Sequence, residues 1–297
     1  MIKDLAYMAF DVPDLDRSIE FAQSVMGLQV TEIQGATAYL SSNQRHHELV
    51  LTQTGERTSY AAIGLEVEHP SVLDSAPARL EAAGGRIELS TAPEEQFAER
   101  TLTVVGPGGH RFRLFSGMPE RRDVKPSETG VQPSQLEHAT VNVSNQPAFE
   151  RFLRRGLGFR FSDRILPFAS FWHCNHDHHG IACFWRPRMN GLNHFAWTIT
   201  EEQLPQVAPL LAERGQELAW GPGHHPAGDN RFIYFFDGAG VLIEYNWGLG
   251  VMPPVGDYRP RTRVLGPRAM DYHGTFPPKH HRNANTPPSA HGSLATR

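Results

Sequence analysis

The sequence has 297 residues, 28 Lys+Arg against 32 Asp+Glu and a formal net charge of −4, with 39% hydrophobic residues and a mean hydropathy of −0.42. This composition is typical of a globular protein with one large or two medium cores, and no run approaches the ~18 consecutive apolar residues of a membrane helix. A mildly acidic chain without a basic patch is a poor candidate for nucleic-acid binding.

The start of the chain places acidic residues early, at Asp4 and Asp11, and lacks a basic region followed by an apolar run. That pattern is not typical of a secretory signal peptide. Two cysteines, Cys174 and Cys183, are too few for a disulfide framework. We therefore expect a protein of the reducing cytoplasm.

The predicted elements begin with an alternating strand, a turn, an amphipathic helix and a new strand after a glycine, over residues 5–30. Residues 45–52 and 63–68 read as further strands. A helix that ends in glycine follows at 71–85, and the stretch 106–117 ends in a last strand. This order corresponds to two β-α-β-β-β units.

The second half repeats the first at a nearly constant offset of about 131 residues. Residues 136–161 correspond to 5–30, and the other matching segments are 177–184, 193–199, 201–215 and 237–248. We predict an α+β fold of two tandem domains, each of two βαβββ modules with cupped mixed sheets. The predicted domains are residues 1–130 and 131–250, and a Pro-rich tail without periodicity follows at 251–297.

Three strands of the second half each present one metal-ligating residue type on a face of small or polar side chains. These residues are His138, His194 and Glu244, and the opposite face of each strand is apolar. Two imidazoles and one carboxylate are the facial triad of non-haem Fe(II) enzymes, which leaves positions open for substrate and O₂. The pattern predicts a mononuclear metal site.

The first half provides an internal control for this site. The sequence repeat aligns Tyr7, Gly64 and Arg113 with the three predicted ligands, and those residues cannot together bind a metal. The fold therefore exists without the triad, which favours a functional reading of the second copy. We expect a metal-free first half and a metal-binding second half.

Two stretches of the second half, FWHCNHDHHGIACF and GHHPAGDNRFIYFFDGAGVLIEYNWG, resemble the type I extradiol ring-cleavage dioxygenases of the vicinal oxygen chelate superfamily. The resemblance covers about residues 1–250 and extends to two-domain enzymes that act on dihydroxybiphenyl and catechol. Gly238 departs from the family signature, which usually has Pro there. The resemblance implies a glyoxalase-like fold, Fe(II) in the second half and a homo-oligomer.

The resemblance also implies catalytic roles for His179, His225 and Tyr234. His179 would stabilise negative charge near the O₂ site and donate a proton, and His225 with Tyr234 would hydrogen-bond the substrate oxygens and assist deprotonation. His224 is an alternative to His225, and the register favours His225. The implied partners are a catecholic substrate and O₂, with neither nucleic acid nor membrane.

Several alternatives remain at this point. Mn(II) can replace Fe(II), because both accept the same ligand types. A hydroquinone-cleaving dioxygenase could use the same triad, whereas a glyoxalase-like isomerase commonly needs ligands from both halves. A non-enzymatic protein that sequesters a ligand in the cup usually lacks the triad. The other twelve of the 16 histidines are given no role, and the two cysteines are expected to be small buried hydrophobes.

Overall fold

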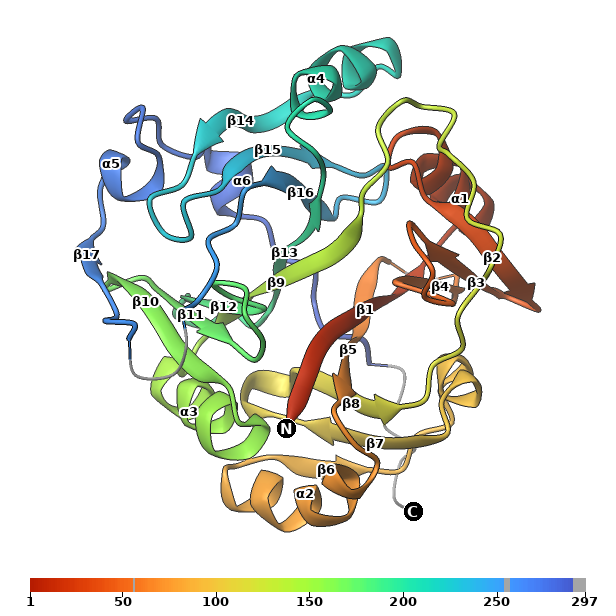
Figure 1. Ribbon diagram of the computed structural model, residues 1–297, viewed down its shortest axis with the longest axis vertical. Coiled ribbons are helices and arrows are strands. Elements are labelled where there is room, and N and C mark those ends of the chain that lie inside the picture. The colour runs from red at the N-terminus through yellow and green to blue at the C-terminus, as the bar shows by residue number, and fades with distance from the viewer. Residues whose placement is uncertain (56, 254–256, 291–297) are drawn as a thin grey trace.

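The computed structural model describes residues 1–290 except 56 and 254–256, and it confirms the predicted α+β architecture (Figure 1). The first half contains β1 (Ile2–Val12), α1 (Leu15–Ser24), β2 (Gln29–Gln34), β3 (Thr37–Ser41), β4 (Leu49–Gln53), β5 (Ser59–Val67), α2 (Ser71–Ala82), β6 (Arg86–Glu88), β7 (Arg100–Val105) and β8 (Arg111–Ser116), with 3-10 turns η1 (Pro93–Phe97) and η2 (Pro107–Gly109).

The second half repeats this order of elements and adds a C-terminal segment. It contains β9 (Gln135–Val143), α3 (Gln146–Arg151), η3 (Phe152–Leu157), β10 (Arg160–Leu166), β11 (Ala169–His173), β12 (Ile181–Trp185), β13 (Gly191–Thr198), α4 (Leu204–Glu213), β14 (Leu218–His224), β15 (Arg231–Phe236) and β16 (Leu242–Trp247), followed by β17 (Thr262–Val264), α5 (Pro267–Met270) and α6 (Lys279–Arg282).

The two halves form two mixed sheets of equivalent strand order. The first sheet runs β2-β3-β4-β1-β5-β8-β7-β6, and the second runs β14-β15-β16-β13-β9-β12-β11-β10-β17. In each sheet the first strands of the two modules lie side by side and antiparallel, β1 with β5 and β9 with β13. The concave face of each sheet is called its cup below, and these central strand pairs carry side chains that line the two cups.

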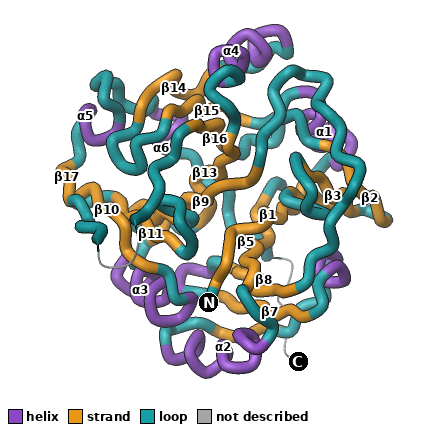
Figure 2. The backbone as a smooth tube through the Cα atoms, in the orientation of Figure 1, coloured by secondary structure: helices purple, strands orange, loops and turns teal. Residues whose placement is uncertain are grey.

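The helices lie at the periphery of the molecule and the strands form its interior (Figure 2). Local signals explain where the first helix of each half begins, because the side chains of Asp14 and Asn145 accept hydrogen bonds from the first-turn amides of Arg17 and Ala148. None of the described helices is long and apolar enough to cross a membrane.

The helix predicted within 136–161 is not uniform. After α3 the chain widens into one π-helical segment, η3, and ends at Gly158, whose φ of 83° lies in the left-handed region that glycine adopts without strain. The wider turn buries Phe152 against Phe112 of the first half, with ring centroids 5.8 Å apart. This segment thus contributes to the packing between the halves.

Strand alternation separates the core from the cup in the second sheet. Val141, Phe195 and Tyr245 lie in the main hydrophobic core, and the side chains next to them in sequence point to the opposite face. The hydroxyl of Tyr245 donates to the carbonyl of Met26, which ties the second sheet to the first half.

The described part of the tail wraps the second sheet. β17 pairs in parallel with β10, Leu192 and Thr286 form an antiparallel bridge, and the carbonyl of Ala284 accepts hydrogen bonds from Asn142 and Asn193. In the described part of the tail, the absence of periodicity therefore does not correspond to an absence of structure. Backbone and amide hydrogen bonds to the sheet hold this part of the tail in place.

The strand register corrects one position of the internal comparison. Tyr7 pairs with Gly64, and Gly64 pairs with Arg113. In the second sheet Ala196 makes both equivalent pairs, with His138 and Glu244. Gly64 is thus the counterpart of Ala196, and His194 corresponds to Ala62. A shift of two residues along a strand leaves the side chain on the same face of the sheet. The conclusion that the first cup lacks the triad is therefore unchanged.

Candidate metal centre

Three neighbouring strands bring the predicted ligands together at one end of the second cup. β9 carries His138, β13 carries His194 and β16 carries Glu244, and the ligand atoms of all three lie within 4.8 Å of one another. Each histidine Nε2 lies 3.2 Å from Oε2 of Glu244. A divalent ion with bonds of about 2.1 Å spaces adjacent ligand atoms by about 3 Å, so the donor set fits a mononuclear metal.

Hydrogen bonds set the tautomer of each candidate histidine ligand. Nδ1 of His138 lies 3.0 Å from the carboxylate of Glu137, and Nδ1 of His194 lies 2.8 Å from the side-chain oxygen of Asn193. Because both oxygens accept, each Nδ1 carries the proton. In the neutral form of each ring, Nε2 therefore carries the lone pair that a metal would use.

The charges at this centre are buried and mutually stabilised. Burial opposes ionisation of Glu244, but His138 and His194 outweigh it and hold the pKa of its carboxyl well below the usual value. Burial likewise opposes the charged form of His138, but Glu244 and Glu137 raise the pKa of that imidazole to about 9. A buried cluster of this kind suits a cation.

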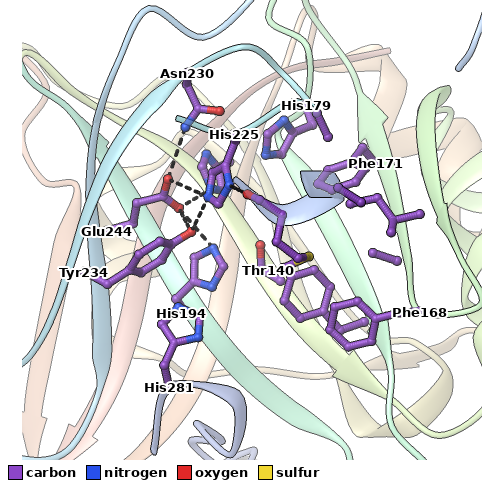
Figure 3. A pocket seen from close by; sticks show the side chains of 17 residues that line it. Thr140, Phe168, Phe171, His179, His194, His225, Asn230, Tyr234, Glu244 and His281 are labelled. Atoms are coloured by element: carbon purple, nitrogen blue, oxygen red, sulfur yellow. Dashed lines mark hydrogen bonds and ion pairs between the residues drawn. The ribbon is translucent and has the colours of Figure 1, made fainter. Parts of the chain in front are cut away.

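His225 and Tyr234 lie beside the carboxylate of Glu244 (Figure 3). The Tyr234 hydroxyl donates to Oε2 of Glu244 at 2.7 Å and lies 3.1 Å from Nε2 of His225. Nδ1 of His225 donates to the carbonyl of Met270 at 2.6 Å, which leaves Nε2 as an acceptor. The single phenolic proton can thus point to either neighbour. Burial, followed by the charge of Glu244, raises the pKa of Tyr234 well above its usual value.

His179 lies on another wall of the pocket, with its ring centroid 4.3 Å from that of His138. Its Nδ1 faces Nδ1 of His178 at 3.0 Å, and Nε2 of His178 lies 3.4 Å from Asp163. Burial, with the neighbouring His138 and His178, lowers the pKa of His179 well below its usual value. The neutral form of this imidazole is therefore favoured.

The pocket in front of these residues contains about 510 Å³ of space, part of it open to solvent. Apart from the polar residues already described, its lining is largely apolar. The apolar residues are Ile165, Phe168, Ala169, Phe171, Phe184, Ala227, Ala269 and Met270. A flat aromatic molecule is a suitable ligand for such walls.

The family model described as the Glyoxalase/Bleomycin resistance protein/Dioxygenase superfamily matches residues 5–114 and 135–245, which are the two sheets. The chain belongs to this superfamily. Biphenyl-2,3-diol 1,2-dioxygenase of Sphingomonas paucimobilis is 26% identical over 281 residues, which cover 88% of this chain and 93% of that relative. Manganese-dependent 2,3-dihydroxybiphenyl 1,2-dioxygenase of Geobacillus genomosp. 3 is 24% identical and covers 87% and 89%.

A solved member of the superfamily has a similar structure. The Mn(II)-bound glyoxalase from Novosphingobium aromaticivorans superposes with a TM-score of 0.84 at 26% identity, which covers 94% of this chain and 93% of that one. The resemblance that the sequence motifs indicated is thus confirmed at the level of superfamily and fold. The role of each site residue stays a prediction.

All six predicted site residues line one pocket, and His225 rather than His224 reaches it. His224 instead contacts Asp229, with Nε2 2.8 Å from the carboxylate. Cys183 is buried beside Ser170, and burial raises the pKa of its thiol to about 12. Cys174 is half-buried.

Asn230, Met270 and His281 are among the pocket residues that the sequence interpretation missed. Asn230 donates to Oε1 of Glu244 at 3.2 Å and directly precedes β15, and its spacing of four residues from Tyr234 could have indicated it. Met270 and His281 come from the tail, where no periodic pattern marked either residue. Only the folded tail brings them to the cup.

In the first cup, other side chains occupy the positions of the candidate metal ligands. Tyr7 occupies the position of His138 and packs edge-on against His47, with centroids 4.9 Å apart. Arg113 occupies the position of Glu244 and forms an ion pair with Glu94. Among the described residues, His138, His194 and Glu244 are the one group with metal-ligand geometry.

Proposed function

We propose that this protein opens the ring of a catecholic aromatic with O₂ at the carbon–carbon bond next to the diol, at a mononuclear Fe(II) ion. The observation that carries the proposal is the convergence of His138, His194 and Glu244 at the base of a largely apolar pocket. The names of the two dioxygenase relatives support the same reaction class. In this proposal residues 131–250 form the metal-binding domain and residues 1–130 the metal-free domain.

His138, His194 and Glu244 would hold the metal through two Nε2 atoms and one carboxylate oxygen. A metal held by three protein ligands supplies open positions for a chelating diol and O₂, and it lowers the pKa of a bound hydroxyl. Fe(II) is the ion that this triad is typical of. Mn(II) is a second candidate, because one relative is named manganese-dependent and the donor atoms suit both ions.

His225 and Tyr234 would receive a proton from the substrate. The carbonyl of Met270 keeps the proton of His225 on Nδ1, so Nε2 faces Tyr234 as an acceptor. The Tyr234 hydroxyl would donate to Nε2 of His225 in place of Glu244, whose carboxylate would hold the metal. The pair then offers a phenolic oxygen to a substrate hydroxyl.

His179 would act first as a base and then as an acid. The carboxylate of Asp163 favours a proton on Nε2 of His178, and Nδ1 of His178 then accepts from Nδ1 of His179. This arrangement leaves a lone pair on Nε2 of His179, at the end of the ring opposite His178. The imidazole can take up a proton there and later return it to the oxygen that gains negative charge.

Turnover measurements test the proposed reaction. Protein loaded anaerobically with Fe(II) is mixed with air-saturated catechols and, in parallel, with hydroquinones, while O₂ uptake and the absorbance of a yellow ring-opened product are recorded. We expect uptake and a yellow product with catechols. Preference for hydroquinones, or absence of uptake from the metal-loaded protein with every diol, would refute the proposal.

An isomerase is the second candidate, because a Mn(II)-bound glyoxalase has a similar structure. The same protein is therefore assayed for isomerisation of the adduct of methylglyoxal with glutathione, which consumes no O₂. Activity there without oxygen uptake on catechols would favour the isomerase.

The proposal extends to location and assembly: a reducing cytoplasm, from the two cysteines of the sequence, and a homo-oligomer, from the family resemblance. We expect more than one chain per particle. Analytical ultracentrifugation of the metal-loaded protein measures this directly.

A further inference from the structure

His281 lies in the pocket without a part in the metal centre. It belongs to α6, its side chain is buried, and its ring packs edge-on against Tyr234 with centroids 4.5 Å apart (Figure 3). Trp220 contacts it from another side, with centroids 5.1 Å apart. These two aromatic rings hold the imidazole at the pocket wall next to the predicted proton acceptor.

Neither ring nitrogen of His281 has a hydrogen-bond partner within the described part of the chain. Buried polar side chains are ordinarily hydrogen-bonded, because each unpaired nitrogen has lost its water without replacement. A phenylalanine would pack equally well against Tyr234 and Trp220. The two unused nitrogens therefore point to a ligand that enters the pocket.

The backbone around His281 is well anchored. The amide of Ala284 donates to the carbonyl of His281 at 3.1 Å, and the carbonyl of Ala284 accepts from Asn142 and Asn193. On the other side, Nε2 of His280 lies 3.1 Å from the carbonyl of Ala219. Contacts at both flanks keep the imidazole at the pocket wall.

On the basis of the proposed function, we propose that His281 hydrogen-bonds an oxygen-bearing substituent on the ring carbon next to the diol of the substrate. Tyr234 faces the diol in the proposed reaction, and His281 touches Tyr234, so the nearest substrate atoms are those ortho to the diol. Phe168 and Phe184, which also line the pocket, offer apolar contact to the ring. His281 is thus a specificity-determining residue rather than a catalytic one.

The test compares the binding of pyrogallol and 3-methylcatechol, which differ by a hydroxyl in place of a methyl group of similar size. Calorimetric titration of Fe(II)-loaded protein without O₂ gives the ratio of the two dissociation constants for the wild type and for His281→Phe. Comparison of these ratios cancels the intrinsic affinity of each catechol for the metal. The matched control is His273→Phe, the same change at an exposed histidine of the tail.

We expect the dissociation constant of 3-methylcatechol, divided by that of pyrogallol, to be about tenfold higher in the wild type than in His281→Phe. This is the effect of one hydrogen bond to a buried group. His273→Phe should keep the wild-type ratio. Equal ratios in the wild type and His281→Phe would overturn the inference and leave the proposed function standing. Failure of the metal-loaded wild type to bind either catechol would instead refute the proposed function. Metal content, measured for every variant, must be unchanged by His281→Phe, and its loss would overturn a specificity role.

Discussion

His178 and His179 face each other through their Nδ1 atoms at 3.0 Å, and Asp163 lies 3.4 Å from the far nitrogen of His178. Although burial opposes it, interactions with His178, the Arg261 amide and Tyr258 hold the pKa of Asp163 at about 2, so its carboxylate stays ionised and only accepts hydrogen bonds. We infer that the three side chains form a directed chain that ends at the pocket, with the charge of Asp163 favouring a proton on Nε2 of His178. The first half repeats the pattern, with Nδ1 atoms of His46 and His47 3.1 Å apart and Glu32 3.2 Å from His46.

Asp163→Asn tests the direction of this chain. An asparagine amide can donate to Nε2 of His178, which would reverse both tautomers and place a proton on Nε2 of His179. We expect kcat to fall by about 10²-fold, the usual lower range for loss of acid–base catalysis, while metal content stays unchanged. Tyr258→Phe is the control, because it removes a tail contact of Asp163 without changing the carboxylate. An equal loss in both variants would mean that Asp163 acts only by anchoring the tail.

His194→Ala and His179→Ala separate metal binding from proton transfer. His194→Ala recreates the situation of the first half, where Ala62 occupies the equivalent position, and we expect it to lose the metal. His179→Ala should retain the metal and lose about 10²–10⁴-fold in kcat. Metal analysis of the two purified variants, alongside oxygen uptake, checks both outcomes. A metal-free His179→Ala protein would make His179 a ligand.

Glu137→Gln probes the support of the metal centre. The Glu137 carboxylate accepts from Nδ1 of His138 and also from Thr198 and Asn246. A neutral amide provides one acceptor fewer, so metal affinity should fall about 10–100-fold. Chelator competition measures the affinity. Thr198→Val keeps the carboxylate and serves as the control, and a decrease of the same size in that variant would contradict an orienting role for Glu137.

Gly64→Ala should destabilise the first cup. An added Cβ would lie 2.2 Å from the ring of Tyr7, which is buried and has little room to move. We expect the free energy of unfolding to fall by about 1–3 kcal/mol, the usual cost of overpacking. Urea unfolding measures the change. In a Tyr7→Ala background the clash is absent, so the additional cost of Gly64→Ala should vanish there.

His110 should make stability depend on pH. Burial lowers its pKa from 6.5 to about 4, so the unfolded chain binds a proton at pH values where the folded protein does not. The contribution of His110 to the free energy of unfolding is therefore fully present above pH 6.5. It decreases by up to about 3 kcal/mol as the pH falls toward 4.

His110→Gln is expected to flatten this decline while it keeps an acceptor for the Tyr60 hydroxyl. Urea unfolding at pH 7 and pH 5 compares the two proteins. The exposed His69→Gln is the control and should show the wild-type decline. A wild-type decline in His110→Gln would rule out His110 as its source.

The sequence by itself determined the repeated order of elements and the faces of the strands that carry the predicted ligands. These features are local, because alternation places His138, His194 and Glu244 opposite apolar neighbours that must be buried. The repeat also supplied the contrast between the two cups. The sequence alignment of the two halves matched His194 with Gly64. A shift of two residues leaves the alternating pattern of a strand unchanged, so only the hydrogen-bonded register identifies Ala62 as the counterpart of His194.

Only the tertiary structure decided which distant side chains complete the pocket. Met270 and His281 lie in a segment without periodicity, and hydrogen bonds between Ala284 and the amides of Asn142 and Asn193 bring that segment to the cup. The proton positions on His179 and His225 likewise depend on Asp163 and on the Met270 carbonyl, which are far away in sequence. Side-chain chemistry is encoded locally, whereas the partners that orient it are set by packing between segments that no local pattern connects.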